Sequence, residues 1–137
     1  MDTEGVISFF LKRRWIIFSL CIVTPLGFWS KSYTGPGFKW FNNYGGGVLY
    51  EVFWCLAVFF FVPSKKNALR IAAWVLIVTS LLEIMQLWRP EFLERIRETY
   101  LGAALLGTTF VWWDFPHYVL GCLIGFLLMR VISIELE

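Results

Sequence analysis

A run of polar side chains interrupts an apolar segment in the middle of the chain. Thr79, Ser80, Glu83 and Gln86 lie at positions i, i+1, i+4 and i+7, so a helix would place them along one face. A carboxylate inside a membrane-spanning helix cannot face lipid cheaply, so we expect Glu83 to be buried and paired, hydrated or protonated. Two interpretations stay open: a functional carboxyl, or interhelical hydrogen bonding for which Gln86 and Ser80 would suffice.

A second candidate is Arg97, in a short charged segment that follows Pro90. Its neighbours at i−4, i+3 and i+4 are Leu93, Tyr100 and Leu101, so a helix would carry Arg97 on its apolar side. An arginine in that place snorkels between headgroups, binds a phosphate or pairs with a carboxylate of the bundle.

The last apolar segment begins with a third polar group. Asp114, His117, Tyr118, Gly121 and Gly125 fall at i, i+3, i+4, i+7 and i+11, on one helical face. Asp114 either belongs to a site or caps the helix. A lone histidine is more typical of a hydrogen-bonded interface than of a metal ligand, so no metal and no cofactor are predicted. The two glycines form a GxxxG pattern, which lets another helix approach closely.

The amino-acid composition indicates whether these polar groups lie in water or in a membrane. Of the 137 residues, 58% are hydrophobic and 20% aromatic, with a mean hydropathy of +0.67, which exceeds what a soluble domain can bury. The net charge of +2 sits in short clusters beside apolar runs, which argues against nucleic acid as a partner. Cys21, Cys55 and Cys122 have no paired spacing, so buried structural thiols are expected. Membrane lipids are the expected surroundings.

The apolar runs predict an all-α membrane protein, a four-transmembrane-helix bundle forming one domain. Crossing a hydrocarbon layer of ~30 Å takes about 20 helical residues. The expected spans are 15–33, 48–62, 68–88 and 117–134, after a cytoplasmic N-terminal segment 1–14, with an interfacial or re-entrant segment 91–113 between the third and fourth spans. Within it, 99–113 is short for a crossing, so a re-entrant helix and a short fifth span are the alternatives.

The distribution of basic residues predicts the orientation. With the N-terminus inside, cytoplasmic positions hold seven Lys and Arg residues and outer loops hold five, of which three lie among glutamates after Pro90. Both termini are therefore expected in the cytoplasm. That orientation brings six candidate site residues close to the outer interface, and Glu51 either joins them or is a solvated residue at a helix start. The six are Glu83, Gln86, Arg97, Asp114, His117 and Tyr118.

These residues lie in stretches that resemble the small bacterial membrane proteins catalogued as domain of unknown function 2809, which are in turn similar to VanZ-like proteins. The resemblance implies a compact fold that crosses the membrane several times. It implies Glu83, Gln86, Arg97, Asp114 and Tyr118 as motif positions and implies no reaction. The matching stretches are 46–51, 53–55, 82–88, 97–107, 108–116 and 118–122.

Three functions fit these residues. The first is a noncatalytic binding or accessory module for a lipid, another amphiphile or a larger membrane complex, with Gly121 and Gly125 as a surface for a partner or a second copy. The second is a small proton-coupled transporter that uses Glu83. The third is an enzyme acting on a lipid-linked substrate, but the sequence contains no nucleophile motif or phosphate-binding loop that would support it. The expected location is the bacterial inner membrane.

Overall fold

The computed structural model describes residues 2–106 and 110–136, and the described residues form helices and short connections without a strand. Of the described helices, the last is the longest. In chain order the elements are α1 (Thr3–Lys12), α2 (Arg14–Ser32), α3 (Phe38–Trp40), a π-helical turn η1 (Phe41–Gly45), α4 (Gly46–Phe61), a 3₁₀ turn η2 (Lys65–Asn67), α5 (Ala68–Met85), α6 (Glu91–Glu98), α7 (Tyr100–Leu106) and α8 (Asp114–Leu136).

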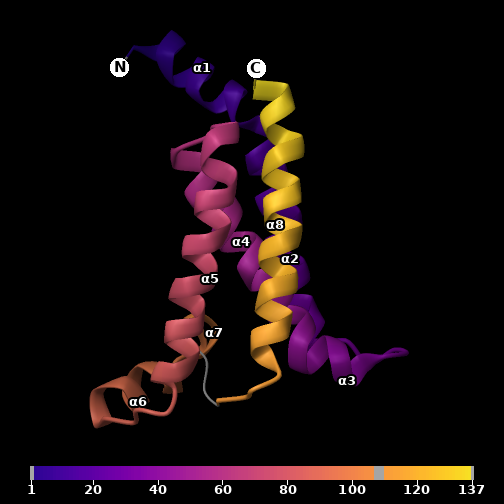
Figure 1. Cartoon of the computed structure of the whole chain (residues 1–137), viewed down its shortest axis with the longest axis vertical. Coiled ribbons are helices and arrows are strands. Elements are labelled where there is room, and N and C mark those ends of the chain that lie inside the picture. The colour runs from indigo at the N-terminus through magenta and orange to yellow at the C-terminus, as the bar shows by residue number, and fades with distance from the viewer. Residues whose placement is uncertain (1, 107–109, 137) are drawn as a thin grey trace.

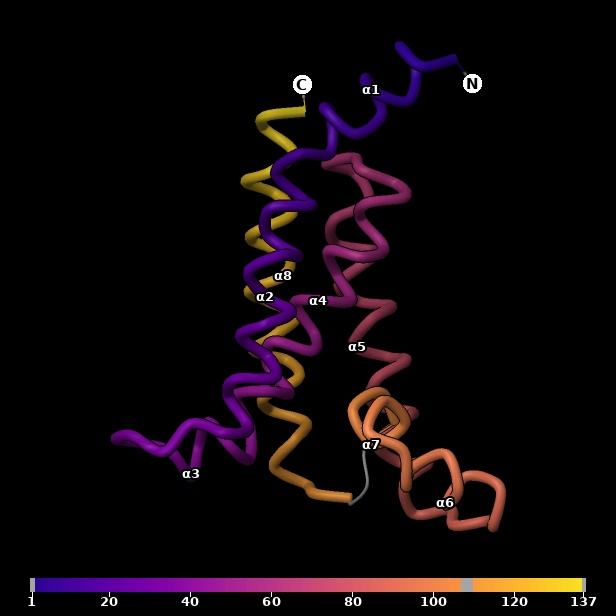
Figure 2. The backbone as a smooth tube through the Cα atoms, turned by 180° about the vertical axis from the view of Figure 1, so that it is seen from behind, coloured from indigo at the N-terminus to yellow at the C-terminus, as the bar shows by residue number. Residues whose placement is uncertain are grey.

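Four of the helical stretches are long and apolar enough to cross a membrane, which confirms the predicted all-α fold with four spans. They run lengthwise beside one another, and the chain begins and ends at the same end of the bundle (Figures 1 and 2). Large apolar side chains point outward all along them. Leu69, Trp74 and Val131 are each more than 60% exposed, which suits lipid rather than water. The spans are Arg14–Ser32, Phe38–Phe61, Lys65–Met85 and Asp114–Leu136.

The second span begins at Phe38, earlier than the expected start at 48. The glycine run and the adjacent asparagines resemble a loop in sequence, yet α3, η1 and α4 form one helical stretch. Gly37 precedes it with a φ of 74°, a conformation that glycine adopts without strain. Asn42 then ties the stretch to the end of α2, because its side-chain nitrogen donates to the carbonyls of Ser30 and Tyr33 at 2.8 and 3.0 Å.

The third and fourth spans also differ from their expected bounds. Helix α5 ends at Met85 rather than at 88, and α8 begins at Asp114 rather than at 117. Pro116 is tolerated in α8 because it lies in the first turn, where the backbone N–H has no intrahelical acceptor.

The segment between α5 and α8 contains two short helices instead of one. Thr99 separates α6 from α7: its backbone is extended, and its hydroxyl donates to the carbonyl of Ile96 and accepts from the N–H of Gly102. Among the described residues only the four spans reach the length of a crossing, and α7 is described over seven residues, so the alternative of a fifth span stays a prediction. Positions 107–109 of the expected re-entrant segment lie outside the described residues.

Helix α4 packs against both α2 and α8, and α8 also packs against α5. Gly121 and Gly125 face α4. An added Cβ on Gly121 would meet the Val48 carbonyl oxygen at 2.6 Å, and one on Gly125 would meet the Cys55 sulfur at 2.8 Å. The GxxxG pattern therefore packs α8 on α4 inside the chain. Cys55 and Cys122 are buried at this contact, whereas Cys21 is exposed and departs from the expected burial.

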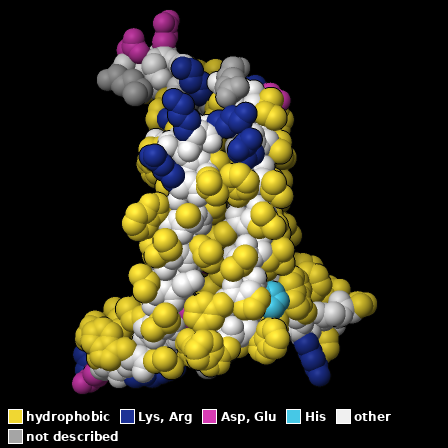
Figure 3. All heavy atoms as spheres, viewed as in Figure 1, with side chains coloured by type: hydrophobic (Ala, Val, Ile, Leu, Met, Phe, Trp, Pro, Cys, Tyr) yellow, Lys and Arg dark blue, Asp and Glu magenta, His cyan; other side chains and the backbone are white. Residues whose placement is uncertain are grey.

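Basic side chains gather at the end of the bundle that carries both termini (Figure 3). Arg13, between α1 and α2, shows how this end is built. Its Nε donates to the Phe60 carbonyl at 2.6 Å and its Nη1 to the Phe9 carbonyl at 3.2 Å. The guanidinium also lies 3.9 Å from the centre of the Phe9 ring. A cation at the C-terminus of α4 offsets the exposed carbonyls of that helix end.

Candidate functional site

Glu83 lies in α5 on the side that faces α8, near the end of the bundle remote from the termini, and it is 1% exposed. Its Oε2 accepts the Tyr118 hydroxyl at 2.8 Å, and its Oε1 accepts the backbone N–H of Val111 at 2.9 Å. Helical phase explains this meeting, because Glu83 lies on the polar stripe of α5 and Tyr118 on the face of α8 that packs inward. Gly47 of α4 leaves room for the Tyr118 ring, which lies 3.4 Å from where its Cβ would be.

Asp114, at the start of α8, brings a second carboxyl to this place. It is half-buried, and its side chain is within hydrogen-bonding reach of the Glu83 carboxyl. Two neighbouring carboxylates in a low-dielectric setting repel each other, which favours a ligand that donates a hydrogen bond to both. Neither takes part in any of the ion pairs formed within residues 2–106 and 110–136. We call Glu83, Asp114 and Tyr118 the acidic cluster.

A third carboxyl, Glu51 of α4, lies deeper in the bundle and is fully buried. Its Oε2 accepts the Thr79 hydroxyl and the Cys122 thiol, each at 3.0 Å, and its Oε1 has no hydrogen-bond partner. The interpretation of Glu51 as a solvated residue at a helix start is wrong, because η1 and α3 extend the helix before it. Its oxygens can only accept hydrogen bonds when charged, so the free one requires a proton or a donor.

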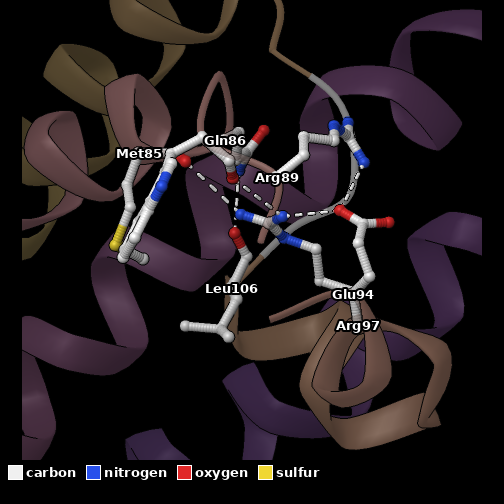
Figure 4. A network of polar contacts seen from close by, with 7 residues as sticks. Met85, Gln86, Arg89, Glu94, Arg97 and Leu106 are labelled. Atoms are coloured by element: carbon white, nitrogen blue, oxygen red, sulfur yellow. Dashed lines mark hydrogen bonds and ion pairs between the residues drawn. The ribbon is translucent and has the colours of Figure 1, made fainter. Parts of the chain in front are cut away.

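Gln86 and Arg97 form a separate group at the end of α5 (Figure 4). Arg97 is 5% exposed. Its Nη1 donates to Glu94 at 2.9 Å and to the Trp88 carbonyl at 3.2 Å, and its Nη2 donates to the Met85 carbonyl at 3.4 Å. Gln86 donates to the Leu106 carbonyl at 2.8 Å. Arg97 therefore joins α6 to the carbonyl end of α5, and its ionic partner is on its own helix rather than in the bundle.

Glu94 lies between two guanidinium groups, those of Arg97 and Arg89 (Figure 4). The hydrogen bond from Arg97 holds the pKa of the Glu94 carboxyl below its usual value; burial opposes this shift, and Arg89 reinforces it. The charged pair therefore persists at neutral pH.

Replacing Arg97 with methionine tests this role in stability. The Arg97→Met variant keeps an apolar stem but leaves the carbonyls of Met85 and Trp88 without their donor, so we expect it to lose about 1–3 kcal/mol of unfolding free energy. Arg95→Met removes a matched guanidinium whose pair with Glu91 is exposed, and it should cost under about 1 kcal/mol. Denaturant titrations followed by tryptophan fluorescence would measure both. Equal losses in the two variants would contradict the role assigned to Arg97.

His117 lies one turn after Asp114 on α8, but its hydrogen bonds go to Trp40 and Trp113, and it packs among aromatic rings. Its Nε2 accepts the indole N–H of Trp40 at 3.0 Å, and its Nδ1 lies 2.7 Å from the Trp113 carbonyl. Because an indole only donates and a carbonyl only accepts, the histidine is the neutral tautomer with its proton on Nδ1. Tyr44 stacks on the ring at 4.2 Å. No group of three or more potential ligands for a metal ion occurs in the described part of the chain.

The structure thus divides the predicted site. It brings together Glu83, Asp114 and Tyr118, places Gln86 with Arg97 elsewhere, and leaves His117 apart. Sequence reasoning missed Cys122 as a partner of Glu51. The available signal was spacing, because Cys122 follows Tyr118 by four positions and therefore shares its inward face.

Four apolar spans enclosing buried carboxyls define a multi-pass helical membrane protein. The chain belongs to the family described as "Protein of unknown function (DUF2809)", whose model matches residues 37–122. The matched region contains Glu51, Glu83, Asp114 and Tyr118, and it ends at Cys122. No solved structure is significantly similar to this chain.

Proposed function

We propose that the protein is a noncatalytic binding module of the membrane, which receives the hydrogen-bond-donating headgroup of a lipid or similar amphiphile at the acidic cluster. One observation carries this proposal. Glu83 and Asp114 lie side by side, the first buried and the second half-buried, with no Lys or Arg pairing with either in the part of the chain that the structure describes.

The charge of the acidic cluster selects the ligand class. The two carboxyls and the unpartnered oxygen of Glu51 are hydrogen-bond acceptors, so a matching ligand must supply donors. A primary amine or a hydroxyl does so. An anionic headgroup would meet like charge in a low-dielectric setting, which costs several kcal/mol.

The surroundings of the acidic cluster favour an amphiphile over a water-soluble solute. Trp112 and Trp113, which precede Asp114, are 75% and 67% exposed, and Trp88 beyond the end of α5 is 57% exposed. Exposed tryptophans are typical of the headgroup layer, where one side of the ring meets lipid and the other meets water. A headgroup at that depth reaches Asp114 first. On this proposal the acidic cluster faces the outer leaflet of a bacterial inner membrane, and both termini are cytoplasmic.

The test is to purify the full chain from membranes in mild detergent and identify by native mass spectrometry what it retains. We expect an adduct with an amine or hydroxyl headgroup that falls at least tenfold in Asp114→Asn and in Glu83→Gln. Glu98→Gln removes an exposed carboxylate outside the acidic cluster and should retain the adduct. A wild-type chain without any adduct, an adduct unchanged in both variants, or an adduct of protein mass would overturn the proposal.

A proton-coupled carrier is a second candidate, which the adjacency of Glu83 and Asp114 favours because two touching carboxyls can pass a proton between them. Flux in proteoliposomes separates the two functions. If the protein is a carrier, the wild type shows proton-driven flux and Glu83→Gln loses it. If the protein is a binding module, the wild type shows no proton-driven flux.

A further inference from the structure

Two adjoining depressions lie on the surface between α1 and α2, at the end of the bundle that carries the termini. One has a volume of about 370 Å³ and the other about 540 Å³. They share Ile7, Leu11 and Arg14, so they are two parts of one surface, which we call the α1–α2 groove. None of its residues belongs to the acidic cluster, which lies at the opposite end of the bundle.

The smaller part of the α1–α2 groove carries charges of both signs. Glu4 and Lys12 line it from α1, Arg14 from α2 and Glu135 from the end of α8. In the described part of the chain none of the four forms an ion pair. Eight residues separate Glu4 from Lys12, about 12 Å along the helix at ~1.5 Å per residue, which keeps them from neutralising each other. Two carboxylates and two cationic side chains of the groove are therefore available to pair with the charges of a ligand.

The larger part of the α1–α2 groove is apolar. Val6 and Phe10 of α1 line one side, and Ile17, Phe18 and Cys21 line the other. With Arg14, the last three lie at i, i+3, i+4 and i+7 on α2, so they follow one face of that helix from its charged start into the membrane. An acyl chain lying on that face would have its headgroup beside Arg14.

Both ends of α1 are fixed beside the α1–α2 groove. Asp2 caps the helix by accepting the N–H of Gly5 at 2.7 Å, and Arg13 anchors the other end of α1 to α4 through the Phe60 carbonyl. The apolar face of α1, including Ile7 and Leu11, is about half exposed. Exposed apolar side chains along a charged helix are typical of a helix that contacts the headgroup layer.

We infer that the α1–α2 groove is a specific site for a zwitterionic phospholipid bearing a primary amine, a phosphatidylethanolamine. The ammonium is bound by Glu4 and Glu135, the phosphate by Lys12 and Arg14, and one acyl chain lies along Ile17, Phe18 and Cys21. Charge complementarity disfavours glycerol and choline headgroups: a glycerol headgroup leaves the carboxylates without a cation, and a choline has no N–H to donate.

Native mass spectrometry of the purified full chain, titrated with lipids of identical acyl chains, tests the inference. We expect phosphatidylethanolamine to be retained about threefold more than phosphatidylcholine or phosphatidylglycerol, since each exposed charge pair contributes only a small part of the binding free energy. The double variant with Glu4→Gln and Glu135→Gln should lose the preference over phosphatidylcholine. Phe18→Ser should weaken retention of all three lipids alike.

The reference chain and the variants all carry Asp114→Asn, so the acidic cluster, at the opposite end of the bundle, contributes no amine preference to the comparison. Glu98→Gln, which removes an exposed carboxylate outside the α1–α2 groove, is the control and should keep the preference. A reference chain without preference, or a double variant that keeps it, would overturn the inference. Binding at the acidic cluster is measured separately, as the adduct that Asp114→Asn loses, so a failure of the proposed function leaves this result unchanged.

Discussion

Gly121→Ala is expected to destabilise the bundle by about 2 kcal/mol, although alanine is the better helix former. The added methyl would lie 2.6 Å from the Val48 carbonyl oxygen and 2.7 Å from the Glu51 Cβ, both closer than van der Waals contact allows. The Val48 oxygen is backbone, so the clash is relieved only by moving α8 away from α4. Overpacking of this kind costs about 1–3 kcal/mol. Unfolding in a denaturing detergent, followed by circular dichroism, would measure the loss.

Gly27→Ala is the matched control in another span. The nearest atom to its added Cβ would be the Leu49 Cβ at 3.9 Å, an ordinary contact. Alanine in a helix interior is up to about 1 kcal/mol more favourable than glycine, so this variant should be as stable as the wild type or more stable. If Gly121→Ala and Gly27→Ala proved equally stable, the close contact between α4 and α8 would be refuted.

The spans were predictable because apolar length is a one-dimensional property of the sequence. Helical phase also predicted the polar faces on which Glu83 and Tyr118 lie, although it did not single out the hydrogen bond between them. Helical phase alone did not predict how deeply Glu51 lies in the bundle, because the glycines before it resemble the start of a helix in the sequence. The structure shows those glycines inside a continuing helical stretch, where Asn42 ties η1 to α2.

Arg97 shows why the rest of the site was not predictable. Its apolar flanks correctly indicate burial, but its partner depends on where α5 ends. Helix α5 ends at Met85, which leaves carbonyls for Arg97 to bind, and the break at Thr99 sets the direction in which α7 leaves. The break at Thr99 is made by local hydrogen bonds of its hydroxyl, and the acceptors of Arg97 at the end of α5 are main-chain carbonyls, for which side-chain pattern carries no signal.

Glu83→Ala is expected to be the most damaging single change in the acidic cluster, with a loss of about 3 kcal/mol. It leaves the part-buried Tyr118 hydroxyl and Val111 N–H without their acceptor, and an unsatisfied buried group costs about 1–3 kcal/mol. Glu83→Gln keeps an acceptor for Val111 and removes the charge beside Asp114. It should therefore remain within about 1 kcal/mol of the wild type, measured by the same detergent unfolding.

A double-mutant cycle with Tyr118→Phe separates this hydrogen bond from the cavity that alanine creates. Interhelical hydrogen bonds in membranes average about 0.6 kcal/mol, with values up to about 1.7. The bond between Tyr118 and Glu83 belongs at the upper end, because its acceptor is a buried carboxyl. A coupling free energy near zero would mean that the tyrosine does not hold the carboxyl in place. If coupling is found and Glu83→Gln is stable, any ligand lost in that variant is lost from a folded protein, so the carboxyl itself binds it.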